Sequence, residues 1–263
     1  MRFFSIVVCI LIVFLTACHP EESGSATSVA ESYKAAASGS DSDSDNQRIE
    51  AVMLEFVEQE EGIEPYAVRM LVTKNHLRID EGLNDDNFLL LDRVSKDVFS
   101  VTHHDQRILK IPHRENLIQA TDSIELSTIE KNTQEMPEFS GKKPRHISFV
   151  ANAETCFDVI AVEGVLEDVV HAIRDYLLTL AGEQTVNLNK TPAEFRTDCM
   201  MSNLVYAPIK HLDYGLPLRE WDYKGYIREL VNYTTIQAEP TLFTLDPGYQ
   251  VYLVNAEEST ETR

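Results

Sequence analysis

Apolar side chains recur at every second position between residues 51 and 111, in short runs separated by polar turns. The alternation is clearest in Val52-Leu54-Phe56 and in Tyr66-Val68-Met70-Val72. Successive side chains of a strand point to opposite faces of a sheet, so this period predicts strands with one buried face. Turn-forming clusters such as Asn84-Asp85-Asp86-Asn87 separate the runs, which predicts an antiparallel meander. Its further strands are expected at 77–79, 88–91, 98–102 and 108–111.

The period changes to that of a helix after residue 163. Strands are expected first at 123–129, 146–151 and 157–162, with a polar loop over 130–145. Apolar residues then share one helical face, and Gly182 is expected just past the end of that helix. The residues of this face are Leu166, Val169, Val170, Ile173, Leu177 and Leu180.

A second helix is expected to begin at Thr191-Pro192-Ala193-Glu194. Thr191 can cap it, Pro192 suits the first turn, and Glu194 can reach back to the Thr191 amide. Phe195 and Cys199, four residues apart, would share its inner face. Final strands are expected at 226–235, 241–245 and 249–254. The chain thus predicts an α+β fold, a mainly antiparallel sheet over residues 50–255 with a two-helix insertion at about 163–212 and a polar tail at 256–263.

Residues 1–17 have the features of an export signal. Arg2 precedes an apolar run that is shorter than the roughly 20 residues a membrane-spanning helix needs. The run ends in Leu15-Thr16-Ala17-Cys18, which resembles the lipobox of bacterial lipoproteins, where the cysteine thiol receives a diacylglycerol. A plain transmembrane anchor or an ordinary cleaved signal would leave the cysteine unexplained. The resemblance implies lipidation, including palmitate, at Cys18, and His19 after it favours the periplasmic face of the outer membrane.

The stretch after the cysteine is rich in serine and acidic residues. Residues 18–49 lack the apolar side chains that would offset the entropy of ordering, so we expect a disordered tether. Asp41, Asp43 and Asp45 alternate as in a calcium loop, but Asn46 stands where glycine is needed and Val52 where an acid is needed. The tether is therefore the preferred interpretation.

Net charge narrows the choice of partners. The chain carries 43 acidic and 23 basic residues, a net charge of -20. Such a chain repels phosphate backbones, so we expect no nucleic-acid partner. Anionic lipid surfaces repel it too, so contact with a membrane is expected through the N-terminal lipid anchor.

Two of the four cysteines remain for the folded domain. Cys9 lies in the export signal and Cys18 in the lipobox, which leaves Cys156 and Cys199. In an exported protein an even pair predicts a disulfide, and two buried free thiols are the alternative. A bridge over this separation would stabilise the fold by about 4 kcal/mol in the chain-entropy model.

Common catalytic motifs are absent from the sequence. It has no Gly-x-Ser-x-Gly elbow, no phosphate-binding glycine loop and no His-Glu-x-x-His. His103-His104-Asp105, with His113, is the densest candidate for metal or acid–base chemistry. Neighbouring strand residues face opposite sides, so a solvated turn is favoured over a metal site there. Cys156 as a nucleophile is weaker still, because a second thiol competes for it. We expect no catalytic residue, metal or cofactor, and no enzymatic activity.

The order of elements resembles that of the LolA/LolB-like envelope proteins. Lipobox, tether, meander, helical insertion and a closing segment Leu242-Phe243-Thr244-Leu245 with Gly248-Tyr249 follow one another. Residues that match related envelope lipoproteins are Arg69, Arg78-Ile79-Asp80 and Leu91-Asp92-Arg93. The resemblance implies a curved half-barrel sheet whose helices cover a concave apolar face that holds acyl chains.

Two functions follow as expectations. The first is a non-enzymatic, lipid-anchored envelope protein that binds a lipid, an acyl chain or another envelope protein on its curved sheet. The alternative is a structural or interaction lipoprotein that docks a partner through a sheet face or an edge strand, without a small-molecule cavity.

Overall fold

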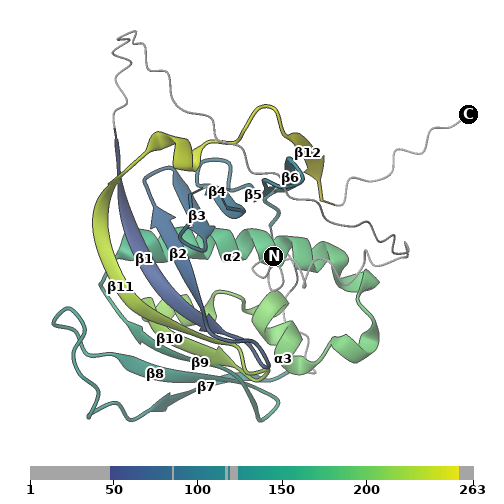
Figure 1. Cartoon of the computed structure of the whole chain (residues 1–263). Coiled ribbons are helices and arrows are strands. Elements are labelled where there is room, and N and C mark those ends of the chain that lie inside the picture. The colour runs from purple at the N-terminus through teal and green to yellow at the C-terminus, as the bar shows by residue number, and fades with distance from the viewer. Residues whose placement is uncertain (1–47, 85, 116–117, 119–123, 255–263) are drawn as a thin grey trace, which may run out of the picture. The chain divides into compact units, whose positions relative to one another are not determined.

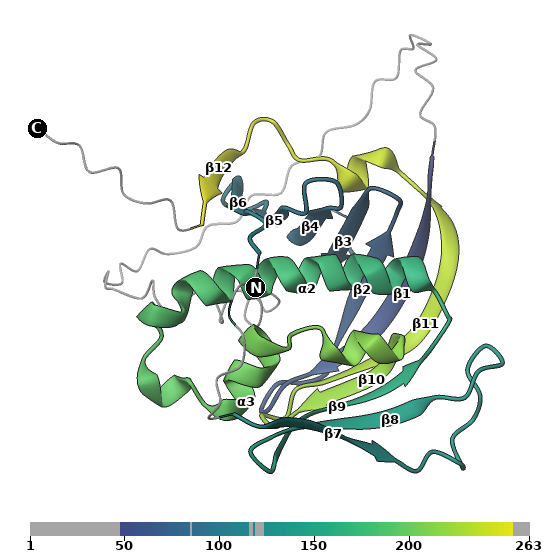
Figure 2. The ribbon, with the colours of Figure 1, turned by 180° about the vertical axis from the view of Figure 1, so that it is seen from behind.

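The computed structural model describes residues 48–84, 86–115, 118 and 124–254. The export signal, Cys18, nearly all of the expected tether and the expected tail lie outside these residues. The described part forms one large curved, unclosed sheet of 12 strands with helical segments against it, which confirms the α+β class (Figures 1 and 2).

All strands but one pair run antiparallel to their neighbours. The order across the sheet is β12-β6-β5-β4-β3-β2-β1-β11-β10-β9-β8-β7, and β12 pairs with β6 in parallel. The strands are β1 (Ile49–Gln59), β2 (Tyr66–Val72), β3 (His76–Asp80), β4 (Phe88–Asp92), β5 (Val98–Thr102), β6 (Arg107–Ile111), β7 (Leu126–Lys131), β8 (Arg145–Ala151), β9 (Glu154–Val162), β10 (Leu216–Asp222), β11 (Ile227–Ala238) and β12 (Gln250–Leu253).

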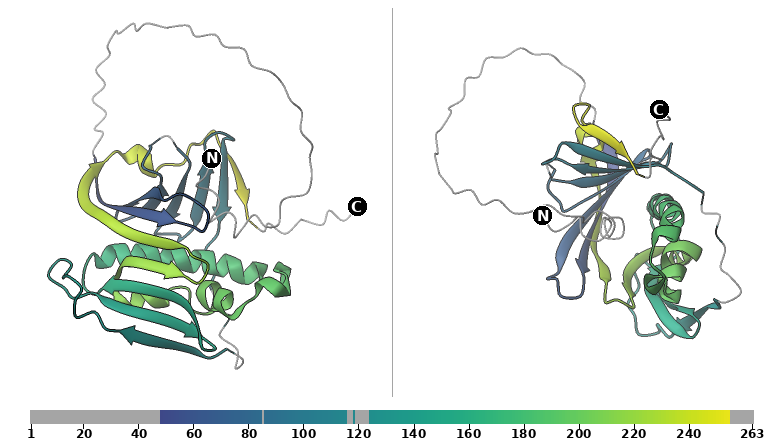
Figure 3. Two further views of the ribbon diagram at one scale, coloured as in Figure 1. Left: turned by 60° about the horizontal axis from the view of Figure 1, so that its bottom comes forward. Right: turned by 90° about the vertical axis from the view of Figure 1, so that its right-hand side faces the viewer.

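The helical segments follow β9 and lie on one face of the sheet (Figure 3). They are α2 (Glu167–Asn187), α3 (Asp198–Met201), the 3-10 turns η1 (Leu188–Lys190), η2 (Ala193–Phe195) and η4 (Lys210–Tyr214), and the π-helical turn η3 (Ser202–Tyr206). A last 3-10 turn, η5 (Pro240–Phe243), follows β11. No helix within the described ranges combines the length and apolar character needed to cross a bilayer.

Each face of the meander buries its own apolar layer. On the face toward α2, here called the inner face, Leu77, Leu91, Val98 and Ile111 are successive cross-strand partners and fully buried. On the outer face, Leu71, Leu90 and Ile108 belong to a second buried cluster that Phe243 of η5 covers. The alternation predicted for 51–111 is therefore weak in places, because both faces of these strands are packed.

Polar contacts hold α2 to the edge of the meander. Arg93 donates to both carboxylate oxygens of Asp168, at 2.9 and 2.6 Å. Thr179 donates to the carbonyl of Lys96 at 2.7 Å and contacts His113 Nδ1 at 3.0 Å. These contacts fix the direction in which α2 crosses the inner face.

The predicted end of α2 at Gly182 is wrong, since the helix continues to Asn187. A Cβ at Gly182 would collide with the backbone carbonyl of Arg114. Glycine at this position allows the close approach of another segment to the helix, rather than a left-handed turn at its end.

The predicted cap at Thr191 is wrong as well. Thr191 Oγ1 donates back to the carbonyl of Asn187, and the helix α3 begins instead after Thr197, whose side chain accepts from the Met200 amide at 3.2 Å. Phe195 is 57% exposed and does not share a buried face with Cys199, which is 1% exposed. The cap of α3 is Thr197, which follows the turn η2.

Two strand assignments also differ. Residues 241–245, predicted as a strand, lie mostly in the turn η5. Strand β10, which the sequence did not predict, pairs with β9 and β11. Pro217 argues against a strand in the sequence, because proline lacks the amide donor of a regular ladder. In the structure it lies at the register shift between β10 and β9.

Candidate functional site

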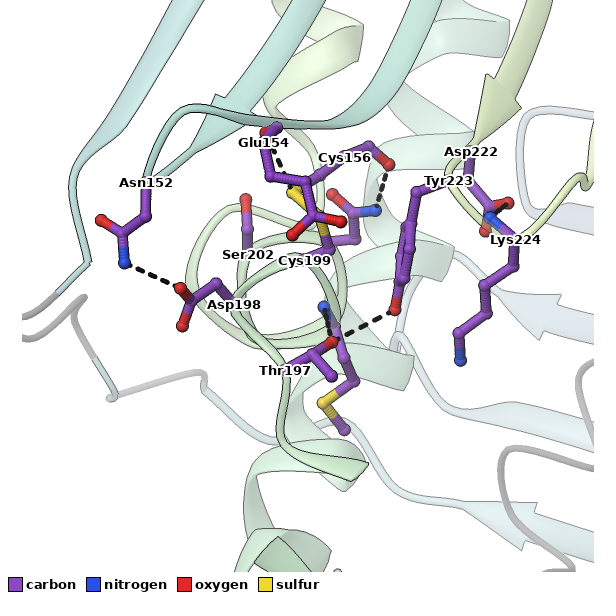
Figure 4. The surroundings of a disulfide bond; sticks show 12 residues. Asn152, Glu154, Cys156, Thr197, Asp198, Cys199, Ser202, Asp222, Tyr223 and Lys224 are labelled. Atoms are coloured by element: carbon purple, nitrogen blue, oxygen red, sulfur yellow. Dashed lines mark hydrogen bonds between the residues drawn. A yellow bond between two sulfur atoms is a disulfide. The ribbon is translucent and has the colours of Figure 1, made fainter. Parts of the chain in front are cut away.

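The disulfide between Cys156 and Cys199 is confirmed. It joins β9 to α3 with the Cα atoms 4.9 Å apart, and both residues are buried (Figure 4). Asn203 Nδ2 donates to the carbonyl of Cys156 at 3.0 Å, which adds a second link between η3 and β9. The bridge fastens the helical segment to the sheet, and Cys156 is a structural half-cystine rather than a nucleophile.

The histidines considered for metal binding do not meet. His103 Nδ1 contacts Tyr249 Oη at 2.7 Å, and His113 contacts Thr179 on α2. His104 and Asp105 are exposed in the turn between β5 and β6. In the part of the chain that the structure describes, no three histidine, cysteine or acidic residues gather as metal ligands.

Ser148, His146 and Asp158 are the residue types of a serine hydrolase, and they lie together on β8 and β9. Their order is different, however. Asp158 Oδ1 accepts from Ser148 Oγ and contacts His146 Nε2 at 2.8 Å. In a hydrolase the histidine takes the serine proton, and here the serine donates directly to the carboxylate. The arrangement stabilises the sheet and does not activate a nucleophile.

A serine–lysine pair lies on the helical side. Lys210 Nζ donates to Ser202 Oγ at 2.6 Å and to Asn203 Oδ1 at 3.0 Å, and burial lowers the pKa of Lys210 to about 8. Ser202 is fully buried, so no substrate reaches its hydroxyl. The pair holds η3 against η4.

A larger group of ionisable side chains lies on the inner face beneath α2. Strand register assembles its centre, because Arg228 of β11 is the cross-strand partner of both Glu58 on β1 and Glu220 on β10. The helical layer adds Tyr176 from α2 and His211 from η4, both 6% exposed. We call the following set the Arg228 cluster: Glu58, Tyr66, Tyr176, His211, Glu220, Tyr226 and Arg228.

Arg228 is the centre of this cluster. Its Nη2 lies 2.9 Å from Glu220 Oε1, its Nη1 lies 3.9 Å from Glu58 Oε1, and its guanidinium stands over the Phe56 ring at 5.1 Å. The side chains of Arg228 and Glu220 are 12% and 7% exposed. Tyr66 donates to Glu60 at 2.9 Å and to Glu58 at 3.3 Å, at the half-buried rim of the cluster.

Four buried polar atoms of the Arg228 cluster have no hydrogen-bond partner among the described residues. They are Arg228 Nε, Glu220 Oε2, His211 Nε2 and Tyr176 Oη. About nine-tenths of buried polar groups in proteins are paired, and an unpaired one costs about 1–3 kcal/mol. Four such atoms in a single cluster indicate a place where a bound molecule or ordered water completes the bonding.

Burial sets the protonation of the cluster. It lowers the pKa of His211 to about 4 and raises the pKa of Tyr176, so both are uncharged at neutral pH. Burial raises the pKa of Glu58, and the charge of Arg228 works against that shift. Burial disfavours the charge on Arg228, but Glu220, Tyr226 and Glu58 hold its pKa above the ordinary value. Arg228 therefore keeps its positive charge, while His211 and Tyr176 beside it are uncharged.

Sequence reasoning gave no functional role to any member of the Arg228 cluster. The available signal was an ionisable residue at an inward position of an alternating strand, as at Glu58 after Leu54 and Phe56. Because strand β10 was not predicted, the pairing of Glu220 with Arg228 could not be inferred.

Three of the residues that carried the family resemblance form a different group, on the outer face. Asp80 is fully buried and binds Arg69 Nε and Nη2, both at 2.8 Å, and Arg78 Nε at 2.6 Å. Arg78 also donates to the carbonyls of Leu242 at 2.8 Å and Asn84 at 3.1 Å. We call Arg69, Arg78 and Asp80 the Arg78 cluster, and it ties η5 to the meander.

Comparison with known proteins gives no family. No family model and no curated protein matches the chain. Two solved structures, described as PNGF-II in a C2 and in a P21 space group, align with 14% and 12% identity and a TM-score of 0.38 each. The alignments cover 79% and 78% of this chain but 31% of the other, so the chain spans under a third of their length. A likeness at this level assigns neither family nor activity.

Proposed function

We propose that this chain is a non-enzymatic, lipid-anchored protein of the bacterial envelope, whose sheet forms a LolA/LolB-like half-barrel that binds a ligand beneath α2. The lipobox supports the proposed location in the envelope, and the unclosed, helix-covered sheet supports the proposed half-barrel fold. The observation that carries the binding function is the set of four unpaired polar atoms in the Arg228 cluster. The ligand is a lipid, or a segment of an envelope protein, with a polar group that completes these bonds.

Native mass spectrometry of the full chain, purified from bacterial membranes, tests the binding function. We expect an adduct of lipid mass that is retained by the wild type and reduced at least tenfold in Arg228→Lys. Arg219→Lys, on β10 and half exposed, is the matched control and should keep the adduct. A wild-type protein free of any adduct would overturn ligand binding.

The anchor has its own test. Cells grown with labelled palmitate should label the wild type and leave Cys18→Ser unlabelled. Equal label in both proteins, or none in either, would contradict lipidation at Cys18 and with it the proposed anchoring in the envelope.

Docking of a partner without a cavity is the second candidate, and the edge of the sheet favours it. β7 is an edge strand that is exposed along its whole length, with Leu126 37% and Ile129 49% exposed. Exposed edge strands pair readily with other chains. If β7 docks a partner, Ile129→Lys should abolish cross-linking to that partner in cells, while Arg228→Lys should leave it unchanged.

A further inference from the structure

The ion pair between Arg228 and Glu220 is half formed. Elsewhere in the domain, Arg69 with Asp80 and Arg145 with Glu130 each make two parallel bonds through Nε and Nη2, all at 2.8 Å. Arg228 makes the Nη2 bond to Glu220 Oε1 only, while Nε and Glu220 Oε2 stay without partners in the described part of the chain. One half of a normally bidentate interaction is therefore available.

The available donor and acceptor lie close together. In a guanidinium group Nε–H and one Nη2–H point along one edge, and a carboxylate normally meets both. Nε and Nη2 share one carbon atom, and so do Oε1 and Oε2, so the 2.9 Å contact between Nη2 and Oε1 also brings the unpaired Nε–H near the unpaired Oε2. A molecule that enters here meets a donor and an acceptor side by side.

We propose that this half-formed pair binds an uncharged group that presents a hydrogen-bond acceptor next to a donor, as a carboxamide or the vicinal diol of a saccharide does. The inference rests on the proposed ligand-binding function and names the chemistry of the ligand's polar group. The acceptor oxygen of the ligand takes the Arg228 Nε–H, and its N–H or O–H group donates to Glu220 Oε2. His211 Nε2 and Tyr176 Oη complete the shell as further hydrogen-bonding atoms.

The charges of the Arg228 cluster disfavour a ligand group of the same shape that carries a charge itself. A carboxylate would face two acids, Glu220 and Glu58, and has no proton to donate to Oε2. An amidinium offers only donors, so its charge and its N–H groups meet the Arg228 guanidinium. Desolvation raises the cost of either mismatch, because these side chains are about nine-tenths buried.

Aromatic rings also pack against the Arg228 cluster. The Phe56 ring lies under the Arg228 guanidinium, and the His211 ring packs 5.1 Å from the ring of Phe157. Tyr66 and Glu60 at the rim are only half buried. They give the route by which a polar group reaches Arg228 from solvent.

Three isosteric probes test the proposal: acetamide, acetate and acetamidinium have one shape and charges of zero, minus one and plus one. The full chain labelled with ¹⁵N is titrated with each, and the Arg228 Nε–H resonance, assigned by its loss in Arg228→Lys, is followed. We expect a saturable shift with acetamide, and shifts at least fivefold smaller with the two ions. The Arg78 Nε–H, which Asp80 already holds, is the internal control and should not move.

Ethylene glycol in a parallel titration distinguishes the two sources of the chemistry. A larger saturable shift with the glycol than with acetamide identifies a diol ligand, and the reverse identifies an amide. If Arg228→Lys does not fold, Glu220→Gln gives the assignment, and Tyr176→Phe should weaken probe binding severalfold in a folded protein.

Two results would overturn the proposal: no saturable shift with acetamide or glycol, or equal shifts with all three isosteres. Either would mean that Arg228 and Glu220 close on each other or on water alone. An adduct seen by native mass spectrometry together with this result would leave ligand binding standing and remove only the assignment of its polar group.

Discussion

The two faces of one sheet hold two buried arginines in similar surroundings. Arg78 on the outer face and Arg228 on the inner face each lie beside carboxylates of the sheet and over a phenylalanine ring, Phe88 at 3.9 Å and Phe56 at 5.1 Å. Both guanidinium groups are largely withdrawn from solvent. Each cluster thus holds a buried arginine between a carboxylate and an aromatic ring.

They differ in how completely their hydrogen bonds are made. Every nitrogen of Arg78 has a partner, in Asp80 and in the carbonyls of Leu242 and Asn84. Arg228 leaves Nε unpaired, and Glu220 leaves Oε2 unpaired, within the described residues. A complete network fixes one structure, whereas an incomplete one keeps bonding capacity for something else.

The comparison separates structural from functional use of the same residue types. The Arg78 cluster links β2, β3 and η5, and every nitrogen of the Arg78 guanidinium and both oxygens of Asp80 are hydrogen-bonded. These residues, which carried the family resemblance in the sequence, therefore serve packing in this chain and do not indicate a binding site. The Arg228 cluster, which matched no motif, is the one with unused bonds.

The largest expected effect is on stability and comes from the complete cluster. Asp80→Asn removes the charge that neutralises two arginines at a fully buried position. Breaking such a network leaves uncompensated buried charge and should cost about 3–5 kcal/mol. Urea unfolding at pH 7, with the full chain, measures it.

Glu220→Gln is the matched change in the incomplete cluster. The amide keeps an acceptor for Arg228 Nη2, and Glu58 still supplies a nearby charge. We expect a cost of about 1.5–3 kcal/mol, the range for one hydrogen bond to a charged group. Equal costs at the two positions would remove the distinction between the clusters.

Acid should act through the Arg228 cluster by way of His211. Its pKa is lowered from 6.5 to about 4 in the folded chain, so the unfolded chain takes up the proton first as pH falls. The stability held at pH 7 is therefore lost as pH falls from 6.5 toward 4, by about 3 kcal/mol. Denaturation of wild type and His211→Gln at pH 7 and pH 4.5 measures the difference.

His211→Gln should flatten most of this loss, because glutamine takes up no proton. Glu58, whose pKa is raised by burial, acts in the opposite direction and remains in both proteins. Glu220, Arg228, Lys210 and Arg174 also lie near His211 and are unchanged. A wild type and variant with the same pH dependence would show that His211 does not report on the cluster.

Much of the sheet could be predicted from the sequence, because alternation depends on local side chains. The meander strands were predicted this way, and the disulfide between Cys156 and Cys199 was predicted from the number of cysteines left for the folded domain. The errors come from long-range contacts. The sequence pattern predicts a helix end at Gly182, because the packing of this glycine against Arg114 cannot be read from the sequence. Strand β10 was not predicted because it contains Pro217.

The candidate site could not be predicted for the same reason. Glu58, Glu220 and Arg228 are far apart in the chain and meet through strand register. The alternation shows that Glu58 faces inward, but it does not show which side chain interacts with Glu58. The sequence searches addressed motifs with fixed spacing, and a cluster built by pairing of distant strands has none.

The smallest expected effects come from two buried hydroxyl groups of α2. One is hydrogen-bonded to other described residues, and the other is not. Thr179 Oγ1 donates to the Lys96 carbonyl and contacts His113, so Thr179→Val leaves both groups unpaired and should cost about 1–3 kcal/mol. Tyr176 Oη has no partner among the described residues, so Tyr176→Phe removes no bond within the protein and should change stability by under about 0.5 kcal/mol. Thermal or urea unfolding of the two variants decides the point. A cost for Tyr176→Phe as large as for Thr179→Val would mean that this hydroxyl is bonded in solution, and the Arg228 cluster would then be as complete as its counterpart on the outer face.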